Sequence, residues 1–204
     1  ESVLYIWRRF GFDGFGQGRS WITDPVEWAP VVDAWLEGIE LPFPPQRWHC
    51  IARTTLGTMR LWGEISGPAL KVDVIDGAIY PNSNEAENMT DPVVRERSGC
   101  TVFTMPLEDL DEDEVTGRPL AVEGIERLGV PGADEVFGFV PPLSFGGRIS
   151  ADRLSVQKAV PYLVGLAQST PRYLGVDLMA AWGGAATQFL IDQGAIPNSA
   201  DPDS

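Results

Sequence analysis

The stretch Asp134–Gly147, DEVFGFVPPLSFGG, is the part of the sequence that most strongly constrains the fold. Its apolar run Val136–Val140 predicts a buried, extended segment. The two prolines at 141–142 lack backbone donors and end any helix or strand ladder at that point. The glycine pair at 146–147 can adopt positive φ without steric cost, so we expect a sharp turn there. This turn would fix how the following segment, residues 158–168, approaches a sheet.

Upstream of this stretch, the hydrophobic period changes at Arg47 from about four residues to about two. Between Arg47 and Tyr80, short segments rich in β-branched or aromatic residues alternate with glycine-containing turns, which is typical of an antiparallel meander. In its first strand, simple alternation places Cys50 and Ala52 on one face and Arg53 on the other. The sequence therefore predicts a central antiparallel sheet.

Segments with a helical period lie on both sides of this meander. They are residues 2–10, about 30–37, 119–128 and about 161–168. Before the second segment, residues 24–27 predict a turn with helix-start chemistry, in which Asp24 is the capping residue. Pro30 should then fall in the first turn of the helix, because a proline deeper in a helix breaks it. Residues 82–100 lack periodicity and predict a loop, whereas residues 171–193 fit either a strand at 173–178 or an amphipathic helix. The predicted fold class is α+β, a central antiparallel sheet with flanking helices.

The composition is strongly acidic. Fifteen Lys and Arg face 29 Asp and Glu, which gives a formal net charge of −14. Such a chain is repelled by nucleic-acid phosphates and by anionic membrane surfaces, so we expect neither as a direct partner. The charge fits either plain solubility or a basic protein partner. Two cysteines, Cys50 and Cys100, form no disulfide framework, which is consistent with a reducing cytoplasm.

The common catalytic and metal-binding patterns are missing from the sequence. His49 is the only histidine, and no C-x-x-C pair accompanies it, so a zinc site is not expected. Ser144 lies in PLSFG, which is not a nucleophile elbow. A calcium loop that starts at Asp109 would need Gly at position 114 and Glu at position 120, where the chain has Glu114 and Leu120. We therefore predict no catalytic residue, no metal and no cofactor.

An acidic run occupies residues 108–114, where every residue but Leu110 is Asp or Glu. Such a run is either a solvated face or an electrostatic patch for a basic partner. Acid–base catalysis by this run would need a cleft and carboxyl groups with separated pKa values, which disfavours a hydrolase.

Three segments together resemble one bacterial family. They are IWRRFGF at 6–12, IART at 51–54 with Gly57 and Trp62, and EVFGFVP at 135–141 with Gly146 and Gly147. The pattern is similar to the GAD-related proteins, named for a domain of glutamyl-tRNA amidotransferases and aspartyl-tRNA synthetases. The resemblance covers residues 1–175 and implies a GAD-like α+β domain there, with residues 176–204 as an extension and mobile tail.

Members of this family serve as immunity proteins that neutralise DNase effectors of type VI secretion systems. The resemblance implies a cytoplasmic, non-enzymatic protein that blocks a cognate nuclease toxin stoichiometrically. The acidic charge agrees with this, because a nuclease needs a basic surface to hold DNA and complementary potentials speed association. The alternative is a GAD-like adaptor or RNA-associated domain. The identity of the toxin, the stoichiometry and the oligomeric state stay open.

Two groups of residues are predicted to bind the partner. The acidic group would steer a basic toxin, and the second group has residue types favoured at binding hot spots. The predicted residues are Asp109, Asp111, Glu112, Asp113, Glu114, Phe145 and Arg148.

Overall fold

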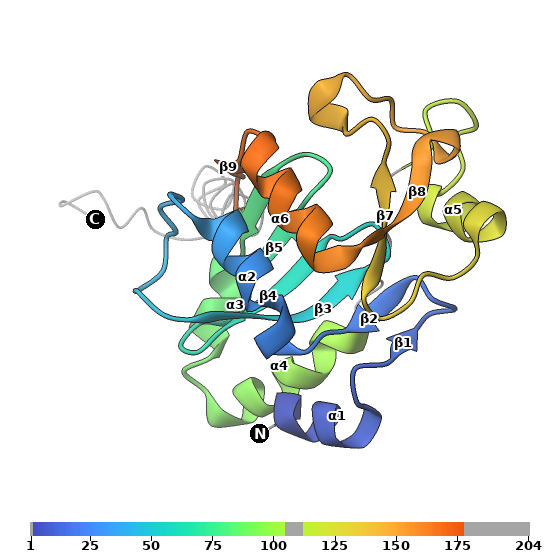
Figure 1. Ribbon diagram of the computed structural model, residues 1–204. Helices are drawn as coiled ribbons and strands as arrows, with labels where there is room; N and C mark the ends of the chain where they lie inside the picture. The colour runs from blue at the N-terminus through green and yellow to red at the C-terminus, as the bar shows by residue number, and fades with distance from the viewer. Residues whose placement is uncertain (1, 105–111, 178–204) are drawn as a thin grey trace, which may run out of the picture.

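The computed structural model describes residues 2–104 and 112–177 (Figure 1). Its helices are α1 (Ser2–Phe10), α2 (Pro25–Leu36), α3 (Ser83–Asn88), α4 (Pro92–Thr104), α5 (Leu120–Leu128) and α6 (Ala159–Ser169), with short 3-10 turns η1 (Leu143–Phe145) and η2 (Ala151–Arg153). Its strands are β1 (Gly14–Phe15), β2 (Ser20–Ile22), β3 (Trp48–Thr54), β4 (Met59–Gly63), β5 (Gly67–Asp73), β6 (Ala78–Pro81), β7 (Glu135–Phe139), β8 (Leu154–Lys158) and β9 (Tyr173–Leu174).

The central sheet confirms the predicted α+β class. Its seven described strands run in the order β1-β2-β3-β4-β5-β6-β9. Every neighbouring pair is antiparallel except β6 and β9, which are parallel. The strands β3 to β6 are consecutive in sequence and in space, as a meander requires. In the described part of the chain, no helix is long and apolar enough to cross a membrane.

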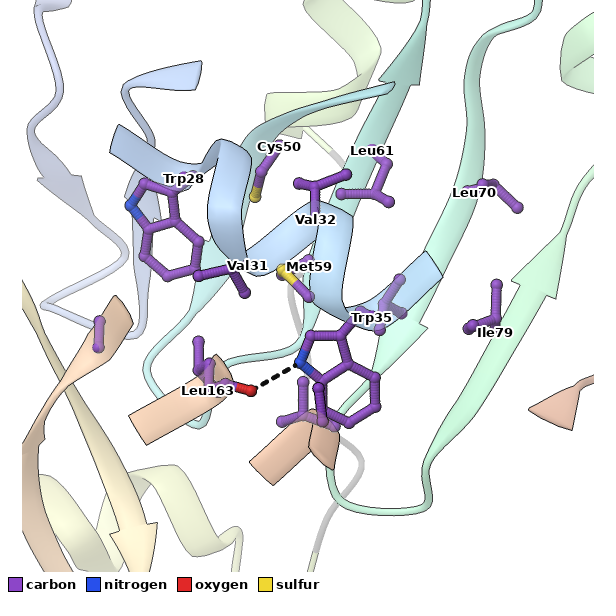
Figure 2. Close-up of a cluster of buried hydrophobic side chains, with 14 of the residues drawn as sticks. Trp28, Val31, Val32, Trp35, Cys50, Met59, Leu61, Leu70, Ile79 and Leu163 are labelled. Carbon is purple, nitrogen blue, oxygen red and sulfur yellow. Dashed lines mark hydrogen bonds between the residues drawn. The ribbon is translucent and has the colours of Figure 1, made fainter. Parts of the chain in front are cut away.

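Helices α2 and α6 lie side by side in front of the central sheet (Figure 1). The helix α2 buries Trp28, Val31, Val32 and Trp35 against the sheet. Figure 2 shows this layer, in which the indole Nε1 of Trp35 donates a hydrogen bond of 3.1 Å to the carbonyl oxygen of Leu163 in α6. The largest core cluster therefore draws on residues from both halves of the chain.

The start of α2 differs from the prediction. The Asp24 side chain accepts a hydrogen bond of 2.8 Å from the Val26 backbone N–H, so the helix begins at Pro25 and not near Pro30. Pro30 is an exposed residue inside the helix. On that side water can replace the hydrogen bond that the proline lacks, which explains why the helix continues.

The opposite face of β3 packs against α1. Val3 of α1 and Ile51 of β3 are buried together, with Trp7 and Trp62 packed against them. A register shift between Cys50 and Ala52 marks a β-bulge in β3. Because a bulge adds one residue to one strand, strict alternation fails beyond it.

This bulge corrects the predicted face of Arg53. Cys50 lies opposite Leu61 and Arg53 lies opposite Met59, and these two partners alternate on one face of β4. Arg53 therefore shares a face with Cys50, where its guanidinium lies 5.3 Å from the ring of Trp28. The simple alternation predicted the other face, because a bulge leaves no obvious signal in the sequence.

A second, two-stranded sheet is formed by β7 and β8, which pair antiparallel from Glu135–Lys158 to Phe139–Leu154. With α5 it encloses a second core cluster that includes Leu120, Phe137 and Leu154. The small sheet is attached to the turn after β3, since the Phe137 backbone N–H donates to the Thr55 carbonyl at 2.9 Å.

Arg53 makes the same connection with its side chain. Its guanidinium donates to the carbonyl oxygens of Gly132 at 3.2 Å and Ala133 at 2.8 Å. Burial lowers the pKa of Arg53 to about 10, so the group still carries its charge at neutral pH. A fully buried arginine thus ties the central sheet to the segment that leads into β7.

Residues 82–100 were predicted to be a loop, and this prediction is wrong. They form α3 and most of α4. Asn82 caps α3 by accepting from the Glu85 N–H at 3.2 Å, and Asp91 accepts from the Val93 N–H at 2.7 Å. No residue of α3 is buried, so it has no hydrophobic period to reveal it. The capping residues Asn82 and Asp91 were the available signal.

The stretch Asp134–Gly147 largely has the predicted structure, a buried extended segment followed by a sharp turn. Residues 136–139 are buried in β7, whereas the side chain of Val140, just beyond the strand, is exposed. Gly146 has φ of 84°, which confirms positive φ within the glycine pair. The helix expected near residues 161–168 is α6. Of the two alternatives for residues 171–193, the described part forms a short strand, β9. The remainder of the ambiguous segment 171–193, from residue 178 onward, lies outside the described residues.

Candidate functional site

The candidate site consists of two adjacent loops. We call residues 112–118 the acidic loop and residues 140–150 the double-proline loop. The backbone N–H of Glu114 donates to the carbonyl oxygen of Ile149 at 2.9 Å, which joins the loops directly. The two loops, which carry the described members of the two predicted groups, are therefore joined although they lie some thirty positions apart in the sequence.

The Asp113 side chain holds this junction together. Its Oδ1 accepts hydrogen bonds from the N–H groups of Val115 at 2.7 Å and Thr116 at 3.1 Å, which closes the acidic loop on itself. Its Oδ2 accepts from the Ser150 hydroxyl at 2.9 Å and the Ala151 N–H at 2.6 Å, at the end of the double-proline loop. One carboxylate thus orders both loops.

The electrostatics of Asp113 follow from these contacts. Burial alone would raise the pKa of its carboxyl group, but the hydrogen bonds from Ala151, Val115, Ser150 and Thr116 outweigh burial. The pKa of Asp113 therefore lies well below its ordinary range, and the group stays ionised at neutral pH.

This placement corrects the view of Asp113 as one exposed charge in a run. It is only 2% exposed, so its carboxylate interacts with groups of the protein and hardly with solvent. Its neighbours Glu112 and Glu114 are exposed, and no basic side chain in residues 2–104 and 112–177 forms an ion pair with either. Asp109 and Asp111 lie outside the described residues. A partner-binding role for any of these carboxylates stays a prediction.

The double-proline loop projects an aromatic side chain. After the cis peptide bond between Val140 and Pro141, the turn η1 presents Phe145, which is 70% exposed. Gly146 closes the turn in the left-handed conformation, and its N–H donates to the Leu143 carbonyl at 3.0 Å. At Gly147 a Cβ would lie 2.5 Å from the Pro141 carbonyl oxygen, so the chain passes there too closely for any side chain.

Arg148 stands at the edge of the same loop. Its guanidinium lies 3.8 Å from Asp152, and about half of the side chain is exposed. An exposed pair of this kind contributes little to stability, so Arg148 is available to a partner. The surface thus combines exposed carboxylates, an exposed phenyl ring and an exposed guanidinium, which is the composition of a protein-binding patch more than of a catalytic cleft.

Sequence reasoning missed two residues that support this surface. Ser150 holds Asp113, and Arg127 of α5 donates to the carbonyl oxygens of Ala151 and Leu154. The sequence did contain a signal for the acidic loop. Asp is a residue type that favours Asx-turns, and Asp113 forms one with the N–H groups of Val115 and Thr116.

Catalytic and metal-binding alternatives find no support in the described residues. They contain no group of three His, Cys, Asp or Glu side chains able to hold a metal ion. Burial raises the pKa of Cys50 to about 12, which leaves this thiol protonated and unreactive. His49 lies 3.4 Å from Glu64. Among the described residues, no hydrogen bond pairs it with a serine or cysteine nucleophile.

Two known families match separate parts of the chain. A GAD-like domain matches residues 1–76. The family described as T6SS immunity protein Tdi1, C-terminal, matches residues 103–169. The chain is therefore similar to GAD-like domains in its first part and to type VI secretion immunity proteins in a later part. The second match contains every described residue of the candidate site, from Glu112 to Arg148.

A solved structure shares the fold of this GAD-related protein. The crystal structure of Atu4351 from Agrobacterium tumefaciens superposes with a TM-score of 0.71 at 20% sequence identity. The match covers 84% of this chain and 76% of that chain. No curated protein matches the sequence.

The two family matches do not correspond to two separate cores. The GAD-like match contains α2, and the immunity match contains α6, yet these helices share one buried cluster. The hydrogen bond from Trp35 to Leu163 crosses from one matched segment to the other. The chain therefore presents its candidate loops on a core that both matched segments build.

Proposed function

We propose that this protein is a cytoplasmic immunity protein that binds a cognate DNase toxin and inhibits it stoichiometrically. The observation that carries the proposal is the placement of the candidate surface. Four exposed side chains lie on two loops that are hydrogen-bonded to each other, within the segment that matches the type VI secretion immunity family. They are Glu112, Glu114, Phe145 and Arg148.

The charge supports a nuclease as the target. A protein of net charge −14 is attracted to the basic surface with which a nuclease holds DNA, and repelled by DNA itself. Glu112 and Glu114 contribute exposed negative charge on the acidic loop, and Phe145 contributes an exposed ring on the double-proline loop that is hydrogen-bonded to it. Such an arrangement combines fast electrostatic capture with an apolar anchor that slows release.

Inhibition of a DNase requires action where bacterial DNA lies, so the proposal places the protein in the cytoplasm. We also propose that residues 1–175 form the binding unit and that residues 176–204 are an extension to it. An oligomer is not required, because the two loops of one chain complete the surface.

The direct test uses the toxin encoded next to this protein. Co-expression should protect Escherichia coli from the toxin and keep plasmid DNA intact, and the purified proteins should form a complex of defined stoichiometry. A variant with Glu112→Gln, Glu114→Gln and Phe145→Ala should fold normally and lose protection. Full protection by this triple variant would remove the two loops from the proposal.

The GAD-like match over residues 1–76 favours a second candidate, an adaptor or RNA-associated domain. This candidate predicts binding to tRNA or to a tRNA-charging enzyme without protection from a nuclease. An electrophoretic shift with total tRNA at physiological salt separates the two, because the acidic charge opposes direct RNA contact.

A further inference from the structure

A pocket lies on the side of the central sheet that faces α1 and α4, remote in sequence from the two candidate loops. Its volume is about 590 Å³, within the roughly 300–1,000 Å³ of sites that bind small organic groups. Apolar and aromatic side chains form most of its lining, from α1, the start of α2, β3, β4 and α4. They are Val3, Leu4, Trp7, Pro25, Ile51, Trp62 and Pro92.

The polar side chains of the pocket carry more negative than positive charge. Glu64 and Glu96 face one guanidinium, that of Arg95, and the single histidine, His49. The guanidinium of Arg95 is already engaged, because it donates to the Glu64 carbonyl oxygen at 3.0 Å. The Glu64 carboxylate lies 3.4 Å from the His49 ring and is about half exposed. Glu96 has no ion-pair partner among the described residues.

Indole rings beside carboxylates form a receptor for organic cations. The face of an indole attracts a cation, and a guanidinium is weakly hydrated and stacks readily on aromatic rings. The protein already uses this chemistry internally, because the Arg53 guanidinium lies 5.4 Å from the ring of Trp21 and 5.3 Å from that of Trp28. The pocket also offers two indole rings, those of Trp7 and Trp62.

We infer that this pocket binds an organic cation, a guanidinium or primary ammonium group on a short aliphatic stem. The stem packs against Leu4, Pro92 and the indole rings, and the charged end is neutralised by Glu64 and Glu96. The inference does not depend on the proposed function. The cation has two possible sources, a free small molecule or a lysine or arginine side chain of a protein partner.

The neighbouring surface leaves room for either source. Pro25 and His49 also line a second hollow of about 1240 Å³, which runs along α2 and the segment 39–48. A partner chain that places a basic side chain in the pocket can therefore continue along this hollow. A free amine would occupy the pocket alone.

The test uses N-acetyl-arginine amide as the probe and N-acetyl-citrulline amide as its neutral isostere. Binding is followed through the indole N–H signals of Trp7 and Trp62 in ¹⁵N–¹H correlation spectra, assigned with the single Trp→Phe variants. We expect the arginine probe to shift these two signals and to leave those of the buried Trp28 and Trp35 unchanged. The citrulline probe should shift none of them.

The double variant Glu64→Gln/Glu96→Gln should weaken binding of the arginine probe roughly five- to tenfold, as expected for two partly exposed ionic contacts. Glu87→Gln on the exposed face of α3 is the matched control and should leave it unchanged. Equal binding of both probes, or equal affinity of the double variant and the wild type, would overturn the inference.

The same spectra distinguish the sources. If the toxin supplies the cation, its complex should block the shifts caused by the arginine probe, and if the ligand is a free molecule, the complex should still bind the probe. A failure of the probe leaves the proposed immunity function untouched, because toxin binding is measured separately. Conversely, if the protein binds the probe but protects against no nuclease, the inference about the pocket stands and the proposed function is wrong.

Discussion

The indole N–H of Trp35 is hydrogen-bonded to the carbonyl oxygen of Leu163, 128 residues away along the chain. Both residues are fully buried. Trp35 lies in the segment that matches a GAD-like domain, and Leu163 lies in the segment that matches the immunity family. The contact joins the two segments at the centre of the main core, so the stability of one depends on the presence of the other.

The first prediction concerns this contact. Trp35→Phe should destabilise the protein by about 2–4 kcal/mol, because it leaves a buried carbonyl unpaired and opens a cavity. Trp7→Phe is the control, since no described residue accepts a hydrogen bond from the Trp7 indole. Urea unfolding followed by circular dichroism gives both values. A similar decrease in the free energy of unfolding for the two variants would mean that the hydrogen bond to Leu163 contributes nothing to stability.

The second prediction concerns Asp113. Asp113→Asn should lower the free energy of unfolding by about 1–3 kcal/mol at neutral pH, because an amide nitrogen would face the donors Ser150 and Ala151. Glu112→Gln, exposed and one residue away, should change it little. Thermal unfolding in a common buffer measures both variants.

The pH dependence gives an independent check of Asp113. Its pKa is lower in the folded protein than in the unfolded chain, so the unfolded chain binds the proton first as pH falls. The stabilisation is complete above the unfolded value of about 4 and is lost progressively below it. The stability difference between wild type and Asp113→Asn should therefore be constant above about pH 5 and shrink in more acidic buffers. A difference that stays constant down to pH 2 would contradict the low pKa.

The third prediction concerns the turn at Gly146. No atom lies within 4 Å of a Cβ built there, so a side chain meets strain in the backbone and no steric clash. Gly146→Ala should cost about 1 kcal/mol, and Gly146→Asn should cost less, since asparagine tolerates positive φ. Melting temperatures in one scan series compare the two. The reverse order would show that φ at this residue is not positive in solution.

The fourth prediction concerns association with the toxin. The variant Glu112→Gln/Glu114→Gln should associate several-fold more slowly at low salt and show a weaker salt dependence, while its dissociation rate changes little. Asp113 is left intact, because its carboxylate is structural. Stopped-flow or surface-based measurements at two salt concentrations give the association and dissociation rates. An unchanged association rate at low salt would show that Glu112 and Glu114 are only solvated surface residues.

The fifth prediction concerns the anchor. Phe145→Ala should raise the dissociation rate of the toxin complex by roughly tenfold or more, with a small effect on association. The melting temperature should be unchanged, because the ring is mostly exposed. Val115→Ala, another exposed apolar residue, tests whether the effect is specific to the double-proline loop. Equal effects of both variants would indicate a diffuse contact without an anchor.

The sequence predicted the features that follow from local rules. The period of two from Arg47 to Tyr80 became the central meander, and the double proline with its glycine pair became a turn with positive φ at Gly146. Both outcomes depend on residues close in sequence. Pattern and turn chemistry act at that range, so one sequence was sufficient.

The failures have equally specific causes. The bulge in β3 moved Arg53 to the other face, and no residue type announces a bulge of this kind. The helix α3 carries no buried residue and was invisible to a hydrophobic period. Asp113 became buried only because Ser150 and Ala151 arrive from a distant segment. Such a contact depends on the tertiary structure, and no local sequence pattern reveals it.

Under the proposed function, the joining of the two loops by Asp113 bears on how new toxin specificities arise. Three of its four hydrogen-bond donors are backbone N–H groups, those of Val115, Thr116 and Ala151. Almost every residue type supplies such a donor, so the side chains at these positions can be exchanged without loosening the junction. Gene duplicates that keep the aspartate can therefore diversify the exposed side chains of both loops, and so build a repertoire of antidotes on one unchanged backbone.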